Sequence, residues 1–430
     1  MTESIPGIWR NGAFVRLWLA STISYFGSFI TRTALPFAAI LVLGAGPLDI
    51  SALRSLELVG GLLVGLVAGA WVDRLRRRPI MIGADIGRAV ILGTIPLAAV
   101  GGVLGMPLLL VAAFLAAILT TFFDVASRTY LPSVVERERL LGANSALTAS
   151  HSVAEFAGFG ISGFLIQVFT APIAIAADAA SFLVSALFLG SIRRSEPPRP
   201  AVAEREPVLR EIRDGLRVVL GSPVLRAIAL AHGATHILWG FFATSYLLFA
   251  THDLGLGPAA IGIIAAIGGG ASFVGAAVAS RVVERIGVGT TFIVGLAGFT
   301  VGSALIPLAP AGAILVAAAF LVAQQIIGDL GGTVYDIVEV SLTQAIVDNR
   351  ILGRVNATIN TYTTLVQLGG TIAGGIAAEL LGLRTALGIG VLGGVAALAF
   401  IWFSPIRGMR TTPGPLVVGS LTAEETPLTE

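Results

Sequence analysis

Long apolar runs recur along the whole chain, and each is long enough to cross a lipid bilayer as a helix. A bilayer core about 30 Å thick needs about 20 mostly apolar residues. Cut at proline, glycine and charged clusters, the runs fall at about 14–43, 50–73, 79–103, 107–131, 140–169, 172–192, 224–250, 258–281, 288–308, 312–337, 352–381 and 384–404. The pattern predicts an all-α integral membrane protein with twelve transmembrane helices.

Composition supports this class and excludes several kinds of chemistry. Of 430 residues, 55% are hydrophobic and 12% are charged, and the mean hydropathy is +0.91. Soluble domains carry about a quarter charged residues. The chain has no cysteine, and all 27 of its basic residues are arginine. Without lysine, a P-loop for nucleotide hydrolysis and a Schiff-base site are both impossible. We therefore expect no enzyme, no cofactor and no nucleic-acid partner.

The arginines predict the orientation in the membrane. They gather before the first span, between spans 2 and 3 and spans 4 and 5, in the long link after span 6, after span 8, before span 11 and after span 12. The alternate loops are nearly bare. Because cytoplasmic loops carry the excess of arginine, we expect a multi-pass protein of the cytoplasmic membrane with both termini and the central link in the cytoplasm.

An internal repeat predicts two similar halves. A shift of 211 residues places Arg139 on Arg350, Gly158 on Gly369 and Gly163 on Gly374. The predicted organisation is an N-terminal six-helix bundle at 1–193, a linker with an amphipathic helix at 194–222, a C-terminal six-helix bundle at 223–405 and a disordered tail at 406–430. Two pseudo-symmetric six-helix bundles of this kind place a transport site between them.

One cytoplasmic hairpin carries a recognisable signature. GAWVDRLRRRP, between spans 2 and 3, resembles the signature G-x-x-x-D-R-x-G-R-R of the major facilitator superfamily, and the matching residues are Gly69, Asp73, Arg74, Arg77 and Arg78. Arg76 stands where that family usually has glycine. The acidic–arginine pair recurs in the second half as Glu284 and Arg285, and Ser280 there replaces the first glycine.

Other segments sharpen the resemblance. FFDVASRTYLPSVV, LLGANSA and DAASFLVSAL are similar to the branch that contains enterobactin exporters and macrolide or multidrug efflux permeases. The resemblance implies a secondary active transporter that exports a small amphipathic organic compound by alternating access, with protons moving the other way. Alternatives are a lipid or lysolipid translocator on the same fold and a non-transporting membrane sensor. The expected partners are a small-molecule substrate, protons and membrane lipid, and we expect a monomer.

Charged residues inside the spans are candidates for a gate. Each costs roughly 2.5–3.5 kcal/mol to place at the centre of a bilayer, so it usually faces a cavity or a partner. Asp85, Arg88, Asp124 and Arg128 could form an inner-face network around Asp73, or they could be static ion pairs. The repeat aligns Arg128 with Glu339, which suggests a pair between the halves.

Five further charged residues are candidates for binding protons or substrate. Glu155 lies near the middle of span 5 and is the first choice for a titrating carboxylate, although a hydrogen bond to a neighbouring helix is the alternative. Arg32 could bind an anionic group of the substrate, or it could pair with Glu57 or Asp178. Asp329 is the candidate of the second half.

Two other patterns concern packing and metals. Gly158, Gly163, Gly369 and Gly374 are predicted to permit close helix packing, because small residues let helices approach each other in membranes. His232 and His236 have the spacing of metal ligands, but no further ligand lies near them in sequence. No metal site is expected.

Overall fold

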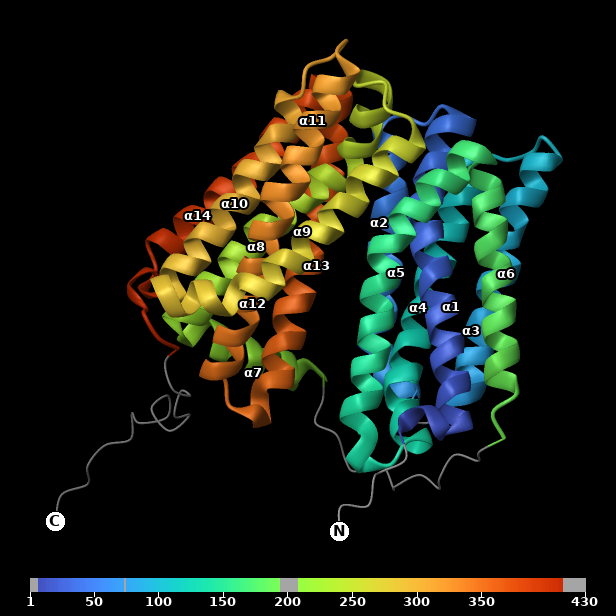
Figure 1. The fold of residues 1–430 in the computed structure, drawn as a ribbon, viewed down its shortest axis with the longest axis horizontal. Coiled ribbons are helices and arrows are strands. Elements are labelled where there is room, and N and C mark those ends of the chain that lie inside the picture. Colours follow the sequence, from blue (N-terminus) through green and yellow to red (C-terminus); the bar gives the residue numbers. More distant parts are fainter. Residues whose placement is uncertain (1–6, 73–74, 194–207, 413–430) are drawn as a thin grey trace.

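The computed structural model describes residues 7–72, 75–193 and 208–412, and throughout these residues it contains helices and no strand (Figure 1). Asp73 and Arg74 of the signature hairpin, residues 194–207 of the predicted linker and residues 413–430 of the predicted tail lie outside the described residues.

The first half contains six long helices. They are α1 (Gly12–Phe37), which continues into the π-helical turn η2 (Ala38–Val42), α2 (Pro47–Val72), α3 (Arg77–Val100), α4 (Met106–Val134), α5 (Leu140–Val168) and α6 (Ala171–Gly190). Helix α1 packs against α5 and α6, while α3 packs against α4 and α6 and α2 packs against α4. The six helices thus form one bundle.

The second half repeats this arrangement. It contains α8 (Pro223–Leu248) with the π-helical turn η4 (Phe249–Asp253), α9 (Pro258–Ile286), α10 (Val288–Leu308), α11 (Ile314–Gln324), η5 (Gln325–Asp329), α12 (Leu330–Ile346), α13 (Asn349–Leu381) and α14 (Leu383–Trp402). Because α11, η5 and α12 are continuous, they make one span. The described residues therefore contain twelve long spans.

The predicted repeat is visible in the helix bounds. Helix α1 begins at residue 12 and α8 at residue 223, which is a shift of 211, and the same shift carries the end of α1 at 37 onto the end of α8 at 248. It also carries η2 onto η4. The residue before each helix, Asn11 or Ser222, accepts backbone hydrogen bonds through its side chain and caps the helix. The two halves thus share helix ends and irregularities.

The helices have the length and composition of membrane spans. Within the described residues, ten of the twelve spans are both long enough and apolar enough to cross a membrane. The other two, α2 and α5, contain 26 and 29 residues. At 1.5 Å per residue, both exceed the bilayer core of about 30 Å. All twelve spans are long enough to cross a membrane.

The two halves meet mainly at one end of the molecule. We call the end of the bundles where α1 begins the proximal end, and the opposite end, where α1 leads into α2, the distal end. Helix α5 packs against α9, and α2 packs against α13. Ser51, near the distal start of α2, donates a hydrogen bond of 2.9 Å to the carbonyl of Thr371 in α13. In Figure 1 the two bundles converge at the top, the distal end, and diverge toward the proximal end.

The structure differs from the predicted organisation at the start of the tail. Residues from 406 were expected to be disordered, but Pro405–Gly408 form the short helix η6 and the side chain of Ile406 is fully buried. The backbone N–H of Gly289 donates to the carbonyl of Met409. This segment is ordered because it covers the start of α10 with an apolar side chain and backbone hydrogen bonds.

A helix also lies where the linker helix was expected. Helix α7 (Val208–Gly221) packs against α13 and α8. Gly215 makes this approach possible, because a Cβ atom there would lie 2.9 Å from the carbonyl oxygen of Arg354 in α13. Val219 is buried, whereas Leu216 and Arg217 are exposed. Helix α7 therefore lies with one side against the second half.

Candidate functional site

A fully buried ion pair lies in the middle of the first half. Asp85 and Arg88 of α3 are one helical turn apart, and their side chains are 0% and 1% exposed. The guanidinium of Arg88 donates to the carboxylate of Asp85 and, over 3.3 Å, to the hydroxyl of Ser24 in α1. It also stacks on two aromatic rings, 4.6 Å from the centre of Phe123 in α4 and 4.0 Å from that of Phe182 in α6.

A second carboxylate from α6 shares this interior. Asp178 is completely buried, and its Oδ1 accepts a hydrogen bond of 3.1 Å from Ser181. Asp178 lies close enough to both side chains for electrostatic interaction, and it is attracted by Arg88 and repelled by Asp85. The alternative in which Asp178 pairs with Arg32 is not realised in this structure. Asp85, Arg88 and Asp178 instead lie together between α1, α3, α4 and α6, and not at a surface that faces the other half.

The other proposed gate residues lie on α4 and α12. Asp124 is half-buried and Arg128 is exposed, and the charges of Arg88, Arg128 and His151 act on Asp124. Glu339, the residue that the repeat aligns with Arg128, does not meet it in this conformation. Its carboxylate instead accepts a hydrogen bond of 3.4 Å from Thr343 and lies 3.9 Å from Nδ1 of His232.

A cluster of charges lies where Arg54 of α2 reaches the backbone of α1. Arg54 and Glu57 form an ion pair at 2.9 Å, so Glu57 pairs within α2. Arg54 also donates to the backbone carbonyl of Arg32 over 3.4 Å. Arg32 itself is exposed, and the charges of Arg54, Glu57 and Glu155 act on it. Since α2 and α5 are the first-half helices that reach the second half, this cluster lies beside the junction of the two halves.

Glu155 lies deep within its helix, as the sequence predicts. It is 15 residues after the start of α5 at Leu140, or about 22 Å along the axis. Its side chain is half-buried. Gly158, one turn later, contacts Phe29 of α1, and Ser162 donates to the carbonyl of Ile30. Helix α5 thus holds Glu155 against α1 and just below the distal contacts.

Asp329, the candidate of the second half, ends a π-helical turn. The turn η5 interrupts the span formed by α11 and α12, and such turns are frequent at functional sites. A Cβ atom at Gly268 of α9 would collide with the side chains of Asp329 and Gln325. The charge of Asp329 also acts on Tyr246 of α8. The irregular turn therefore presents an amide and a carboxylate toward α9.

The signature hairpin contributes a helix cap. Arg78 donates to the carbonyl of Leu189 over 2.7 Å and to that of Gly190, so it satisfies the C-terminal carbonyls of α6. Arg77 lies beside it at the start of α3, and Gly69 lies in the last turns of α2. Glu284 and Arg285 are exposed at the proximal end of α9.

Three of the four predicted packing glycines make close contacts. A Cβ atom at Gly158 would lie 2.7 Å from Cβ of Phe29, and one at Gly374 would lie 2.7 Å from Cα of Phe241. A Cβ atom at Gly163 would lie 3.0 Å from Cα of Gly262 in the other half. Gly369 differs from the prediction, because it is exposed and a Cβ atom there would meet nothing within 4 Å. The close approach belongs to Gly370, which lies against Ile237.

The two histidines of α8 lie side by side with their rings tilted by 52°. Their ring centres are 4.6 Å apart, and Nδ1 of His236 donates to the carbonyl of His232 over 2.8 Å. In the described residues, no group of three or more histidine, aspartate or glutamate side chains is arranged to hold a metal ion. The pair is therefore a packing feature with one carboxylate, Glu339, nearby.

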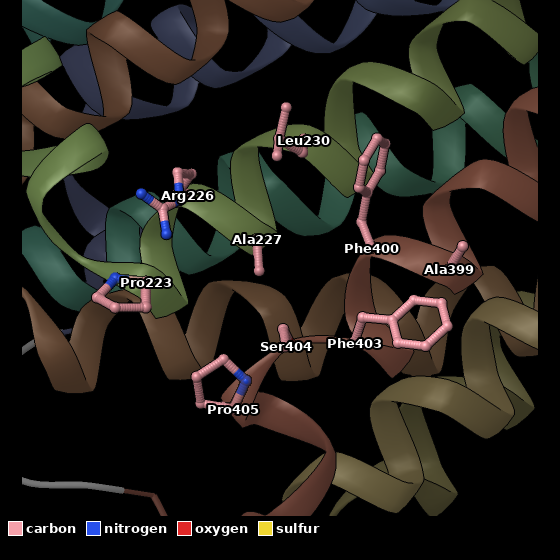
Figure 2. A pocket seen from close by; sticks show the side chains of 9 residues that line it. All are labelled: Pro223, Arg226, Ala227, Leu230, Ala399, Phe400, Phe403, Ser404 and Pro405. Atoms are coloured by element: carbon pink, nitrogen blue, oxygen red, sulfur yellow. The ribbon is translucent and has the colours of Figure 1, made fainter.

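A surface pocket lies away from the junction of the halves. It has a volume of about 330 Å³ and lies between α8 and α14 (Figure 2). Its wall is apolar except for Arg226 and Ser404, and it includes Phe400 and Phe403. Phe403 is 86% exposed. An apolar pocket on the outside of a membrane bundle suits lipid chains better than a transported solute.

Sequence reasoning missed most of the partners of the charged residues. Ser24, Phe123 and Phe182 surround Arg88, although each comes from a different helix. Tyr25 stacks edge-on against His151 of α5 with ring centres 4.9 Å apart. The signal available in the sequence was the polar face of span 1, where Ser21, Ser24 and Thr31 interrupt an apolar run.

Comparison with known proteins places the chain in a family. The family model of the Major Facilitator Superfamily matches residues 17–250. The uncharacterized MFS-type transporter YfiS of Bacillus subtilis (strain 168) is 26% identical over 389 residues, which cover 88% of this chain and 90% of that protein. The multidrug efflux pump Tap of Mycolicibacterium fortuitum is 30% identical over 231 residues, which cover 51% of this chain and 55% of Tap.

Solved structures share the fold. A bacterial homologue of the iron transporter ferroportin in an inward-facing state has a TM-score of 0.71 and 16% identity, over 92% of this chain and 100% of that one. A bacterial homologue of the human lysosomal transporter Spinster, inward-facing and occupied, has a TM-score of 0.70 and 16% identity, over 93% and 97%. Together with the twelve spans and the repeated halves, the family match shows that this chain is a multi-pass membrane transporter, and not an enzyme, of the Major Facilitator Superfamily.

Proposed function

We propose that the protein exports a small amphipathic organic compound across the cytoplasmic membrane by alternating access, in exchange for protons. The observation that carries this proposal is the way the halves meet. Their main contacts join α5 to α9 and α2 to α13 near the distal end. With the proximal end on the cytoplasmic side, as the arginine distribution predicts, this arrangement is an inward-facing state.

The repeat supports a rocking movement of the halves. We take residues 1–193 and 223–405 as the two moving units, joined by the linker at 194–222. Gly163 of α5 contacts Gly262 of α9, and the corresponding contact of the other pair joins Gly375 of α13 to Ser51 near the start of α2. Two equivalent contacts made of small residues can open together, because no large side chain interlocks them. Their opening, with closure at the proximal end, would give the outward-facing state.

The residues beside the junction suit an amphipathic solute. Arg32 offers an exposed guanidinium, and Glu155 offers a carboxylate in the same cluster. Phe29 of α1 and Phe159 of α5 lie next to each other, with ring centres 6.3 Å apart. In the second half, Trp239 is exposed and lies 5.9 Å from Phe299. Aromatic walls with few polar groups are typical of sites for organic compounds.

The class of compound is proposed from one relative and from these residues. Tap is named a multidrug efflux pump, and the sequence resembles the efflux branch over several segments. The energy source is proposed to be the proton gradient, because the chain has no lysine for a nucleotide-binding P-loop. We assign proton binding to Glu155, the carboxylate beside the junction of the halves, and Asp329 is its candidate counterpart in the second half.

Accumulation of fluorescent ethidium and of radiolabelled erythromycin tests the function. Cells that lack their own efflux pumps would express the wild type, Arg32→Ala, Glu155→Gln or the control Glu138→Gln, which changes an exposed loop carboxylate. We expect the wild type and the control to lower accumulation of at least one compound, and a protonophore to abolish the effect. Arg32→Ala should raise accumulation again, and Glu155→Gln should remove the dependence on the proton gradient. Equal accumulation in wild-type and empty-vector cells would contradict the proposed export of these classes.

A further inference from the structure

The interior of the first half holds one more negative group than it can balance by a direct ion pair. Asp85, Arg88 and Asp178 are each no more than 1% exposed. The guanidinium of Arg88 binds the carboxylate of Asp85 directly. With both carboxylates ionised, this trio would keep a net charge of −1 in a low-dielectric interior, where an unbalanced charge is strongly disfavoured.

Nearby groups do not remove this excess. Asp85 contacts Arg88 directly, and the carboxylates of Asp178 in α6 and Asp124 in α4 lie near enough to interact with its charge. Beyond Asp124 lie Arg128, which is exposed, and His151 of α5. From α1, the helix packed against α6, Asp178 meets Gly27 and the hydroxyl of Thr31. Among the described residues, Arg88 is the only buried cation near Asp178, and it is already paired with Asp85.

The hydrogen bonds around Asp178 are also incomplete. One oxygen of Asp178 accepts from Ser181, but its Oδ2 is buried without a hydrogen-bond partner. The hydroxyl of Thr31 is also buried without a partner in hydrogen-bonding geometry. A buried carboxylate oxygen without a donor is costly. If Oδ2 carries a proton, the group becomes neutral and gains an O–H that can donate to a neighbouring oxygen such as that of Thr31.

The two carboxylates are not equivalent in this respect. Asp85 is held by the guanidinium, and this pair is also enclosed by Phe123 and Phe182. In the described residues, Asp178 has no cationic atom within 4.0 Å, and it packs against the backbone of Gly27. The proton is therefore better placed on Asp178 than on Asp85.

We propose that Asp178 is a proton-binding site enclosed in the first half, protonated in the inward-facing state and competing with Asp85 for Arg88 when it loses its proton. The site lies directly behind the wall of the substrate region, because Thr31 faces Asp178 and the next residue of α1, Arg32, is exposed beside Glu57 and Glu155. Release of the proton would leave an ionised carboxylate that attracts Arg88 and repels Asp85. Helix α1 would carry that change toward the other half, because it packs against both α5 and α6.

A role of this proton in transport rests on the proposed function. The protonation of Asp178 can be tested without it. Infrared difference spectroscopy of the purified full-length protein in detergent measures protonation directly. The wild type should show a protonated-carboxyl band that shifts in heavy water, and Asp178→Asn should lose the part of this band that comes from Asp178. The control Glu57→Gln should keep the band, because Glu57 is balanced one to one by Arg54 and is not fully buried.

Thermal unfolding gives a second, independent measurement. Asparagine has the shape and neutrality of a protonated aspartate, so Asp178→Asn should unfold near the wild-type temperature at low pH. Asp85→Asn should unfold earlier, because it removes the partner of Arg88. A wild type without the band, or a band that Asp178→Asn leaves at full intensity, would overturn the proposal. An Asp178→Asn variant that loses as much stability as Asp85→Asn would indicate a permanently ionised Asp178 and would overturn it as well.

Transport is the separate arm of the test. In proteoliposomes with an imposed proton gradient, ethidium efflux by Asp178→Asn should lose its dependence on the gradient while downhill efflux persists. If the infrared band behaves as expected but wild-type liposomes move no ethidium, the proposed function for this compound fails and the proton site stands. If the wild type is proton-driven and Asp178→Asn is equally so, the coupling role of Asp178 is wrong.

Discussion

Ser51 of α2 donates a 2.9 Å hydrogen bond to the carbonyl of Thr371 in α13, and this bond joins the two halves near the distal end. Thr244 of α8 donates to the same carbonyl over 3.2 Å. Shifted by 211 residues, Ser51 corresponds to Gly262, which lies against Gly160 and Gly163 of α5. The distal contacts therefore follow the repeat in position, but one pair has a side-chain hydrogen bond and the other is backbone against backbone.

The glycines of α13 give a test of packing with an internal control. Gly374→Val should lower the melting temperature in detergent, because its side chain would collide with Phe241 of α8. Overpacking of this kind typically costs about 1–3 kcal/mol. Gly369→Val is the control, since a Cβ atom there meets nothing within 4 Å. Equal melting temperatures for the two variants would contradict the orientation of α13.

Removal of the buried guanidinium should be among the most damaging single changes. Arg88→Met would leave Asp85 without its partner in the interior, which typically costs about 3–5 kcal/mol. Adding Asp85→Asn to this variant should restore a large part of the stability, because the unpaired charge is then gone. Unfolding curves of the two single variants and the double variant measure the coupling. Additive losses in the double variant would show that the pair is not coupled.

Arg128 and Glu339 are predicted to meet when the proximal end closes. The repeat relates these two positions, and in the present structure neither forms an ion pair with the other, while Glu339 lies near His232. Arg128→Glu and Glu339→Arg should each reduce ethidium efflux, and the double reversal should recover much of it. Failure of the double reversal to exceed either single variant, at matched expression, would reject an attraction between them.

The helices and the repeat could be predicted because apolar length and a constant shift are local properties of the sequence. All twelve predicted runs coincide with helical spans, and the helix ends follow the 211-residue shift that Gly158 and Gly163 revealed. The three π-helical turns could not be predicted in this way. A single additional residue per turn leaves the apolar pattern nearly unchanged, so the turn that ends at Asp329 has no distinct local signal.

The surroundings of the charged residues were harder to predict. The spacing of Asp85 and Arg88 indicates a pair along one helix, but it does not say that Phe123 and Phe182 enclose it or that Asp178 adjoins it. Those contacts depend on the rotation of α4 and α6. The same uncertainty in rotation explains why close packing was predicted for Gly369 and is found at its neighbour Gly370. The two glycines differ only in the direction that they face.

A cysteine cross-link between the halves tests alternating access most directly. The chain has no native cysteine, and a Cβ atom at Gly160 of α5 would lie 3.7 Å from Cβ of Ala266 in α9, a separation that suits a disulfide. We would measure ethidium efflux in proteoliposomes by Gly160→Cys with Ala266→Cys, before oxidation, after oxidation and after reduction, with each single variant as a control. The account predicts that oxidation stops efflux in the double variant alone and that reduction restores it. Efflux that continues at the same rate through fully cross-linked protein would contradict the account.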